Sequence, residues 1–407
     1  MFDKIVGQDR AINLLKNAII SGRIAQGYIF YGIEGVGKLT TALTFAKIIN
    51  CKRISPLIPS DEVRQAEEIE IRPCNSCSSC NKIDNFIHPD VKFYFSIPNF
   101  DLDEYGYVKL KAIHEKDPEK NADWVSYQNY IKSKINTPWK DHIFDKTTAI
   151  RIEQIRGLQK DILLSKYEGE KKVYIIEGFD SLTAQASNAF LKTLEEPPAD
   201  THFILIVNNI EKLLPTILSR CVKIKFHNIS TNIIENYLSN VLQAESLKAR
   251  LFSRLANGSL KNAINLYYDE NLKIMDITIE FLNIVLASDD IAYLNWIEIN
   301  FLKEKKNTEI FNSFIQYLCL WVKDLQVYNL LASGEPQGKL IGDSLVFINQ
   351  IELMEKYILK NRYFSELVSN LLLELDEYVI KSTGNVNQKL ILSQVYHSFL
   401  RIFTDDK

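Results

Sequence analysis

The stretch that decides the fold of this chain is Gly32-Ile33-Glu34-Gly35-Val36-Gly37-Lys38-Leu39-Thr40. It follows an apolar run at 28–31 that predicts a buried strand, and it precedes residues 41–49, which predict a helix. A glycine-rich loop that ends in lysine between a strand and a helix is typical of a phosphate-binding loop. Backbone N–H groups and the helix N-terminus would point at phosphate oxygens, and Lys38 would reach the outer phosphates. We therefore expect an α/β domain with a nucleotide site.

Two groups that nucleotide hydrolysis needs are missing from the pattern. The residue after the loop lysine should offer a hydroxyl to Mg²⁺, but it is Leu39. Thr40 has a hydroxyl, yet one residue of helix turns a side chain by about 100°. The buried strand predicted at 173–176 should end in two acids, and it ends in Glu177 and Gly178. Glu177 can help a metal, whereas Gly178 cannot orient water. The pattern predicts lost hydrolysis. The alternative to a functional nucleotide site is a relic loop kept for folding.

The composition sets the broad class of protein. A length of 407 residues indicates two or three domains, and the net charge of −3 requires neither nucleic acid nor an acidic membrane as a partner. No apolar run reaches the roughly 20 residues of a membrane span. The first residues, Met1–Lys4, do not resemble a signal peptide. We expect a cytoplasmic protein.

Four of the six cysteines indicate a structural metal site. Cys74, Cys77 and Cys80 are spaced by two residues, and Cys51 lies upstream, so the chain can supply the four thiolates of a closed Zn²⁺ site. Because 22 residues separate Cys51 from Cys74, His88 stays open as an alternative ligand, although its His-Pro-Asp context also fits a turn. The simpler alternative is a loop with buried thiols. Four thiolates leave no open position, so we assign the site no catalysis.

Alternating buried strands and helices predict a parallel sheet covered on both faces. Residues 91–147 are interpreted as an insertion rich in aromatic side chains, with a helix near 124–135. Asp180 is interpreted as an acid at the N-terminus of the helix that follows it. Regular elements resume at residue 150. We expect helices at 150–164, 184–196 and 213–218, and strands at 203–207 and 222–226.

Strand patterns end near residue 228, which predicts three parts of the chain. Residues 1–228 would form the nucleotide-binding domain, with a zinc module at about 51–90 and the insertion at about 91–147. Residues 229–275 would form a small helical unit. Residues 276–407 would be all-helical, with a break at 333–342.

Arg220 is a lone cation between two apolar runs, in Ser219-Arg220-Cys221. One interpretation is a surface salt bridge. The other is a guanidinium that reaches the γ-phosphate of a neighbouring molecule, where arginine stabilises transition-state charge.

Together these motifs resemble the clamp-loader branch of the AAA+ ATPases, and within it the delta-prime subunits of bacterial DNA polymerase III more than the related gamma/tau subunits. The order of Leu194–Pro198 (LEEPP) before Ser219–Cys221 (SRC) is the most specific feature. The other matching stretches are Val6-Gly7-Gln8, the loop at 32–40, the cysteine cluster followed by His88-Pro89-Asp90, Asn188–Thr193, Leu214–Leu218, Gly258-Ser259-Leu260-Lys261 and residues 385–390.

The resemblance implies a P-loop (AAA+) domain, a helical lid at 229–275 and a collar for oligomerisation at 276–407. It implies a five-membered ring of delta-prime, gamma/tau and delta subunits that uses ATP to load the sliding clamp on primed DNA in replication. Arg220 would be a finger that acts in trans, and the zinc would be held by Cys51, Cys74, Cys77 and Cys80. The nucleotide, ATP or ADP with Mg²⁺ bound weakly or not at all, would contact Gly32, Gly35, Gly37, Lys38, Thr40, Glu177, Asn208 (the sensor-1 position) and Lys261 (where sensor 2 usually has arginine).

Three functional hypotheses follow from these residues. The favoured one is a silent stator within the DNA-directed DNA polymerase complex, because Leu39 and Gly178 predict that the chain itself lacks ATPase activity. The second is an active gamma/tau-like ATPase in which Thr40 takes the metal through a shifted loop. The third is a zinc-dependent nucleic-acid-binding protein whose aromatic insertion stacks on exposed bases.

Overall fold

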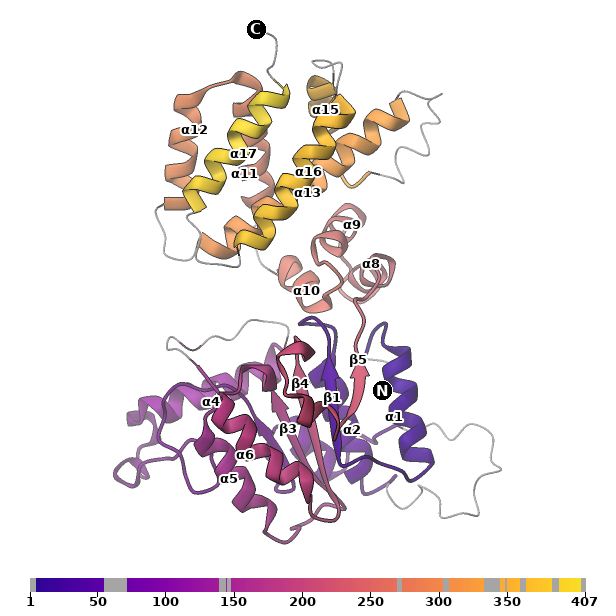
Figure 1. Cartoon of the computed structure of the whole chain (residues 1–407), viewed down its shortest axis with the longest axis vertical. Helices are drawn as coiled ribbons and strands as arrows, with labels where there is room; N and C mark the ends of the chain where they lie inside the picture. Colours follow the sequence, from indigo (N-terminus) through magenta and orange to yellow (C-terminus); the bar gives the residue numbers. More distant parts are fainter. Residues whose placement is uncertain are drawn as a thin grey trace. The chain divides into compact units, whose positions relative to one another are not determined.

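The computed structural model describes residues 5–54, 72–138, 144, 148–268, 273–302, 307–332, 345–347, 350–358, 364–382 and 388–403. The predicted start at 1–4, most of the spacer between Cys51 and Cys74, the break at 333–342 and the collar motif at 385–387 lie outside the described residues. The chain divides into two compact units, one holding a sheet and one holding helices (Figure 1). The first comprises Met1–Ile234 with Gly258–Asn265, and the second comprises Glu235–Asn257 with Leu266–Lys407.

The first unit is built on a five-stranded sheet with the order β2-β3-β4-β1-β5. All neighbouring pairs are parallel, as the sequence predicted. β4 is buried along its whole length, which explains its uninterrupted apolar sequence. The strands are β1 (Gly27–Tyr31), β2 (Val91–Tyr94), β3 (Lys172–Glu177), β4 (Thr201–Val207) and β5 (Val222–Lys225).

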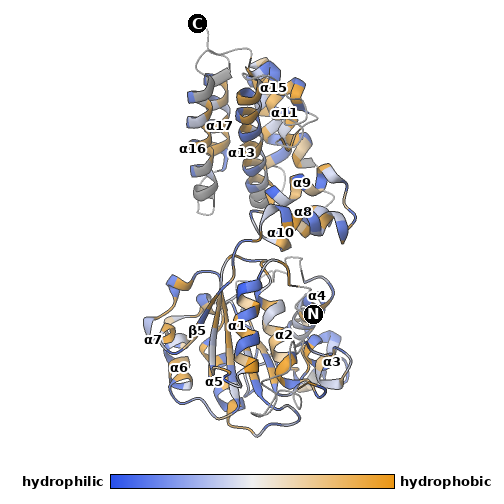
Figure 2. Cartoon of the chain, turned by 90° about the vertical axis from the view of Figure 1, so that its right-hand side faces the viewer, coloured by the Kyte–Doolittle hydropathy of each residue, from blue (hydrophilic) through white to orange (hydrophobic). Residues whose placement is uncertain are grey.

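Helices cover both faces of this sheet (Figure 2). On one face, α5 (Ile152–Ile162) and α6 (Ala184–Glu195) share a core with alternate strand residues such as Ile176 and Leu205. On the other, Phe45 of α2 (Lys38–Asn50) packs edge-on against Tyr28 of β1, with ring centroids 5.5 Å apart. Other helices described in this unit are α1 (Asp9–Ile20), α3 (Ser78–Asp84), α4 (Ala122–Asn136), α7 (Pro215–Leu218) and the short 3₁₀ turns at Ala112–His114, Pro118–Lys120, Phe179–Ser181 and Ile210–Lys212.

Two details differ from the sequence prediction. Residues 91–94, which we assigned to the insertion, form the edge strand β2 and pair with β3. Asp180 does not begin the following helix: the N-cap of α6 is Thr183, whose hydroxyl accepts from the Ala186 N–H at 3.2 Å. A threonine cap fits this position as well as an acid does, so the sequence pattern alone could not separate them.

The segment predicted as a lid contains α8 (Thr231–Asn240), α9 (Ser246–Leu255) and α10 (Leu260–Tyr268). Its residues are shared between the two units, since 258–265 pack with the sheet unit and 235–257 with the helical one. The glycine-serine turn that starts α10 therefore belongs to the unit that holds the phosphate-binding loop.

All the regular elements in the described residues of the second unit are helices. Its core is aromatic, with Trp296 and Trp321 almost fully buried, and Cys319 is buried there as expected. None of the described helices has the length and apolarity that a membrane crossing requires. Besides α9 and part of α8 and α10, its described elements are α11 (Lys273–Ala287), α12 (Asp290–Ile297), a π-helical turn (Glu298–Leu302), α13 (Asn307–Ala332), α15 (Ile351–Ile358), α16 (Phe364–Ser382) and α17 (Gln388–Phe403).

Candidate functional site

The strand order brings the phosphate-binding loop to the ends of β3 and β4. Because β1 pairs with β4 and β4 with β3, the residues that follow these strands meet at one edge of the sheet. Lys38 Nζ donates to the carbonyls of Gly32 at 2.5 Å and Ile33 at 2.7 Å, and to Asn208 Oδ1 at 2.8 Å. Burial lowers the pKa of Lys38 to about 8, an effect that the carboxylates of Glu34, Asp180 and Glu177 oppose. Lys38 and Asn208, far apart in sequence, thus share one site.

The start of α2 offers little to a divalent cation. Gly37 is its N-cap, with φ at +96°, and Lys38 is its first residue. Leu39 is half-buried, and the hydroxyl of Thr40 belongs to an exposed residue. The next threonine is committed to the helix itself, since Thr41 Oγ1 donates to the Gly37 carbonyl at 2.8 Å. Of the two threonines after Leu39, Thr41 thus donates its hydroxyl hydrogen to the helix backbone, whereas Thr40 is exposed.

The acid at the end of β3 has a partner that the sequence did not predict. Glu177 Oε2 lies 2.8 Å from Nζ of Lys134, on helix α4 of the insertion. Gly178 follows in the left-handed region with φ at +74°. Asp180 accepts the backbone N–H groups of Asn208 at 3.2 Å and Asn209 at 3.0 Å, so it holds the loop after β4 in place. The residues present do not fit Mg²⁺ coordination, because the hydroxyl is missing and the remaining acid is paired.

The turn at Gly258–Lys261 packs directly on the phosphate-binding loop. Gly35 has φ at +79°, and a Cβ there would lie 2.1 Å from Ser259 Oγ. Lys261 donates its N–H to the Gly35 carbonyl at 3.3 Å, and its Nζ lies 2.5 Å from Glu34 Oε1. Burial favours the neutral form of Glu34, but the Lys261 hydrogen bond and the charges of Lys261, Lys134 and Lys38 lower its pKa overall. Lys261 thus lies beside the loop.

Sequence reasoning missed the structural role of Gln8. Its side chain pairs with the backbone of His227 in both directions: Nε2 donates to the carbonyl at 2.7 Å, and Oε1 accepts the N–H at 3.0 Å. Gln8 is almost fully buried. This pairing ties the segment before α1 to the chain leaving β5. An amide can mimic a strand partner in this way, yet nothing in the local sequence indicates which backbone it will meet.

Arg220 lies on the exposed surface after α7. Its Nη2 is 3.0 Å from Glu195 Oε1, and its Nη1 donates to the Thr216 carbonyl at 2.9 Å. The surface salt bridge that we considered is therefore present, and it links SRC to LEEPP. The next residue, Cys221, is buried against β1, where a Cβ on Gly27 would lie 2.7 Å from its Sγ. Arginine and cysteine of the same motif thus face solvent and core respectively.

The four predicted cysteines come together. The Sγ atoms of Cys51, Cys74, Cys77 and Cys80 all lie within 4.8 Å of one another, and those of Cys74 and Cys80 are 4.0 Å apart. Four sulfurs around zinc at about 2.3 Å would be separated by about 3.8 Å, so the cluster is compatible with a tetrahedral site. Burial opposes ionisation of Cys74, but hydrogen bonds from the backbone of Ser76 and Cys77 lower its pKa to about 6.

Polar residues behind the cysteines fix this module to the sheet. His88 is not part of the thiol cluster: its Nε2 contacts Ser79 Oγ at 3.1 Å, and its Nδ1 accepts the Asp90 N–H at 3.1 Å. Burial lowers the pKa of His88, although the charge of Glu168 opposes the shift. The Asp90 carboxylate accepts three backbone N–H groups at 167–169, over 2.7–2.8 Å. The His-Pro-Asp turn is thus structural, and Cys51 supplies the fourth thiol.

Comparison with known proteins places this architecture in a sequence family. A family model described as DNA polymerase III, delta subunit, matches residues 7–230, which is more than half of the chain. The chain belongs to this family. The match covers the phosphate-binding loop, the cysteines, the insertion and Arg220 within a single span.

Curated relatives of this delta subunit family member carry several subunit names. The chain is 28% identical to the DNA polymerase III gamma subunit of Buchnera aphidicola subsp. Baizongia pistaciae, over 65% of this chain and 56% of the relative. It is 27% identical to the tau subunit of Salmonella typhimurium, over 65% of this chain and 32% of the relative. It is 29% identical to the delta' subunit of Bacillus subtilis, over 61% of this chain and 56% of the relative. The chain spans about half or less of the length of these relatives, and the identities do not separate the subunit types.

Among solved structures, a gamma subunit-related protein of Thermotoga maritima covers 96% of this chain and 99% of its own, at 13% identity and a TM-score of 0.37. The Bacillus subtilis clamp loader delta protein covers 96% and 99%, at 11% identity and a TM-score of 0.27. Since both TM-scores lie below 0.5, the fold assignment rests on the sheet itself and on the sequence family.

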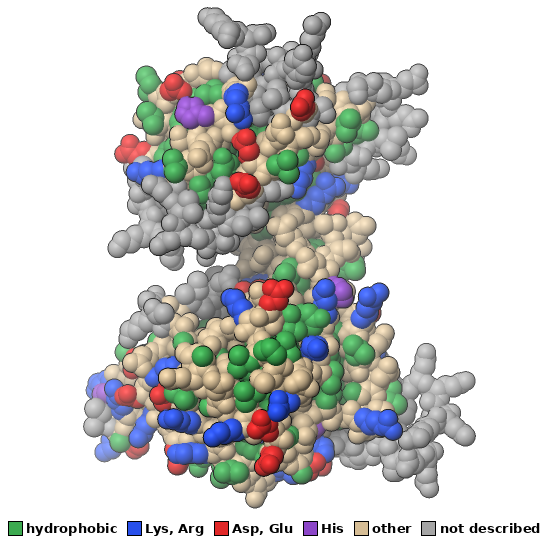
Figure 3. Space-filling view, viewed as in Figure 1, with side chains coloured by type: hydrophobic (Ala, Val, Ile, Leu, Met, Phe, Trp, Pro, Cys, Tyr) green, Lys and Arg blue, Asp and Glu red, His purple; other side chains and the backbone are tan. Residues whose placement is uncertain are grey.

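The aromatic side chains of the insertion stack on one another. The Phe95 ring lies 4.6 Å from that of Tyr130 and 5.9 Å from that of Tyr127, and Tyr130 lies 4.7 Å from Phe144. Trp139, another aromatic residue of the insertion, lies outside the described residues. In the face shown in Figure 3, lysines and arginines of the first unit are interspersed with acids. The described aromatics therefore form a small core, which is the simpler explanation of their frequency.

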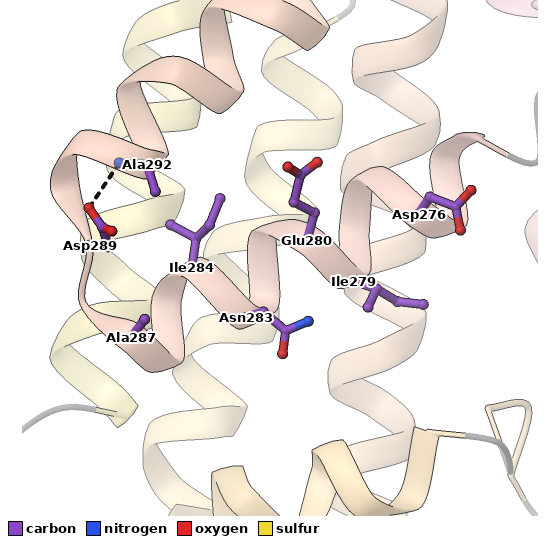
Figure 4. A pocket seen from close by; sticks show the side chains of 8 residues that line it. All are labelled: Asp276, Ile279, Glu280, Asn283, Ile284, Ala287, Asp289 and Ala292. Carbon is purple, nitrogen blue, oxygen red and sulfur yellow. Dashed lines mark hydrogen bonds between the residues drawn. The ribbon is translucent and has the colours of Figure 1, made fainter.

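A separate hollow of about 470 Å³ lies in the second unit, against α11 and the start of α12 (Figure 4). Asp289, at its rim, accepts the N–H groups of Ile291 at 3.1 Å and Ala292 at 2.9 Å, so its carboxylate caps α12. The lining is mixed apolar and acidic, with Asp276, Ile279, Glu280, Asn283, Ile284 and Ala287. These lining residues indicate no reaction.

Proposed function

We propose that this chain is a clamp-loader subunit of a DNA polymerase III, and that within the loader it acts as a delta-prime-like stator. It would not hydrolyse ATP itself. It would present Arg220 to a nucleotide bound on a neighbouring gamma/tau subunit. Its partners would be gamma/tau and delta subunits in a five-membered ring, with the sliding clamp and primed DNA reached through the complex. We expect it to act in the cytoplasm.

One observation carries this proposal: the end of β3 holds an acid already paired with Lys134, followed by a glycine where hydrolysis needs a second acid. An ATPase orients water with such a group and holds Mg²⁺ with the loop hydroxyl, which Leu39 replaces here. In a head-to-tail ring each subunit uses two different surfaces. A subunit can therefore lose its own chemistry and still complete a neighbour's site.

Arg220 is suited to the surface that completes the site of a neighbouring subunit. Its side chain is about one-third exposed, at 34%, and its partner Glu195 is half-exposed, at 51%. An exposed ion pair is weak, so a phosphate of higher charge can take the guanidinium away from Glu195. Phosphoryl transfer gains most from a cation that reaches the γ-phosphate as charge develops on it.

The proposed cofactors follow from the residues described. Zn²⁺, held by Cys51, Cys74, Cys77 and Cys80, would stabilise the module and leave no open position for catalysis. A nucleotide would be held by backbone N–H groups at Gly32, Gly35 and Gly37 and by Lys38. Lys38 would exchange its carbonyl partners for phosphate oxygens, with Asn208 and Lys261 beside it.

The test is ATP turnover by a loader reconstituted from this chain and its own gamma/tau and delta subunits, with clamp and primed DNA. We expect Arg220→Ala to lower turnover at the completed site by about tenfold or more. Lys223→Ala, which removes an exposed cation from β5 nearby, should leave the rate unchanged. If the complex with Arg220→Ala turns over ATP as fast as the unaltered complex, Arg220 does not act on the neighbouring site. Turnover by the isolated chain that is lost in Lys38→Ala would instead support the active-ATPase alternative.

A further inference from the structure

Lys134 is a charged residue near the nucleotide site, and the proposed function uses it only as the partner of Glu177. It belongs to α4 of the insertion, yet its ammonium lies 2.8 Å from Glu177 at the end of a central strand. Burial raises the pKa of Glu34, but the hydrogen bond and charge of Lys261 lower it, and the charge of Lys134 lowers it further. Lys134 therefore lies near the phosphate-binding loop as well. A cation from the insertion is therefore paired with the strand acid, near the loop.

The helix that carries Lys134 is anchored rather than loosely attached. Tyr130, one turn before Lys134, stacks on Phe95 at 4.6 Å with only 15° between the ring planes. Phe95 directly follows β2 and is buried, with 3% of its surface exposed. The ammonium lies 5.7 Å from the centroid of the Tyr130 ring, and the Lys134 side chain is 17% exposed. The insertion thus holds the cation from the same sheet edge that forms the nucleotide site.

The acid that Lys134 contacts is the one beside which a phosphate-binding loop normally holds a metal. There the cation is held between a loop hydroxyl and the strand acid, and it bridges the outer phosphates. Here the hydroxyl is absent at Leu39, and the strand acid already binds an ammonium. A divalent cation at Glu177 would have to displace Lys134 or lie beside a like charge, and both are unfavourable in a partly buried site.

An ammonium has three N–H donors, and the bond to Glu177 uses one of them. The charged side chains that face this region are balanced: the acids are Glu34, Glu177 and Asp180, and the bases are Lys38, Lys134 and Lys261. The ammonium of Lys134 could therefore neutralise part of the negative charge that two or three ionised phosphate oxygens bring, without any metal.

We propose that the ammonium of Lys134 takes the place of the divalent cation, so that a nucleoside di- or triphosphate binds to this chain without metal. The inference rests on the nucleotide site of the proposed function but not on the Arg220 finger. Lys134 neutralises the outer phosphates and Glu177 orients it, while Lys38 and the loop amides bind as in other phosphate-binding loops. Such a site retains nucleotide but lacks the metal that hydrolysis uses.

The test is equilibrium binding of ATP and ADP to the purified full chain by calorimetry, with excess EDTA and with excess MgCl₂. For the unaltered chain we expect the two dissociation constants to agree within about twofold. Lys134→Met keeps most of the side-chain stem against Tyr130 and removes the charge. It should weaken binding in EDTA by about tenfold or more, and binding should then improve when Mg²⁺ is added. Lys134→Arg should retain binding in EDTA.

Lys132→Ala is the matched control, because Lys132 is an exposed lysine on the same helix. It should bind both nucleotides as the unaltered chain does. Circular dichroism on every variant separates lost binding from lost folding. If Lys134→Met unfolds, binding by Lys134→Arg in EDTA still tests whether a cation at this position is enough. The proposal is overturned if the unaltered chain needs Mg²⁺, if it binds neither nucleotide, or if Lys134→Met binds equally well in EDTA. None of these results changes the turnover measured for Arg220→Ala in the complex, so the two proposals fail separately.

Discussion

The guanidinium of Arg220 lies 3.0 Å from the carboxylate of Glu195, 25 positions earlier in the chain. Glu195 ends α6, which Pro197 and Pro198 prevent from continuing, and Arg220 follows α7. The pair joins the two motifs whose order was the most specific part of the sequence. Under the proposed finger role, the guanidinium would have to detach from Glu195 to meet a phosphate.

The first prediction concerns this detachment. Replacing Glu195 by Ala removes an exposed partner, so we expect the free energy of unfolding to change by less than about 1 kcal/mol. ATP turnover of the reconstituted complex should stay equal or rise, because Arg220 no longer has to break an ion pair with Glu195 before it meets a phosphate. Urea unfolding and the ATPase assay measure the two effects. A fall as large as that of Arg220→Ala would mean that Glu195 positions the arginine, contrary to this account.

The second prediction concerns the cysteine cluster. Purified chain should contain about one equivalent of zinc by atomic emission, and Cys74→Ser should lose most of it. The same variant should unfold at a lower temperature, because metal binding contributes directly to folding of the module. Cys319→Ser changes a buried cysteine of α13 outside the cluster, and this variant should contain as much zinc as the unaltered chain. Full zinc content in Cys74→Ser would show that this thiol is not a ligand.

Much of the sheet unit could be predicted because its signals are local. A buried parallel strand is a short apolar run, and a phosphate-binding loop is a contiguous pattern, so both were recognised with their boundaries nearly right. The cysteines could be grouped because a metal site of this type needs four thiolates. Cys51 could be added despite the long spacer before Cys74, because the site needs a fourth thiolate, and its sulfur does lie with the other three.

The rest depended on contacts between distant segments. The pairing of Lys134 with Glu177 joins an insertion without regular periodicity to a strand 43 positions later. The bond from Gln8 to His227 spans 219 positions. A single polar residue carries no sign of its partner, because its side chain can satisfy many donors and acceptors. The role of Asp180 was misread for the same reason, since an acid near a helix start fits several kinds of backbone contact.

The third prediction concerns restoration of the missing acid. Gly178 has φ at +74°, where a side chain costs about 1–2 kcal/mol, so Gly178→Glu should destabilise the protein. Combined with Leu39→Thr it should still give no turnover by the isolated chain, because Glu177 remains paired with Lys134. Thermal unfolding and an ATPase assay test both parts. Gly178→Ala should be destabilised to a similar degree, which would assign the loss to backbone strain rather than to charge.

The fourth prediction concerns the packing of Cys221 against β1. A Cβ at Gly27 would lie 2.7 Å from the Cys221 Sγ, so Gly27→Ala should cost about 1–3 kcal/mol through overpacking. Cys221→Ala removes the obstructing sulfur at a cost of about 1 kcal/mol. The double variant should be more stable than the sum of the two losses predicts, with a coupling of about 0.5–3 kcal/mol in urea unfolding. Simple additivity would show that the strand shifts instead of clashing.

The fifth prediction concerns pH. Burial lowers the pKa of Lys38 to about 8, so a substantial fraction of chains loses this charge just above neutral pH. A phosphate binds the protonated ammonium, so binding is strongest below pH 8 and weakens as the pH rises through that value. At pH 9 about one-tenth of the free chains would carry the charge, which predicts about tenfold weaker binding of ADP than at pH 7. The terminal phosphate ionises near pH 6 and is not the cause.

Calorimetric titrations at pH 7, 8 and 9 measure this slope, all with EDTA present so that no metal titrates. Lys134→Met should bind more weakly at each pH but keep the same slope, because the dependence belongs to Lys38. Binding that stays constant from pH 7 to 9 would mean that Lys38 retains a pKa near its ordinary value of about 10.4. The carboxylates of Glu34, Asp180 and Glu177 would then outweigh the burial that otherwise lowers it.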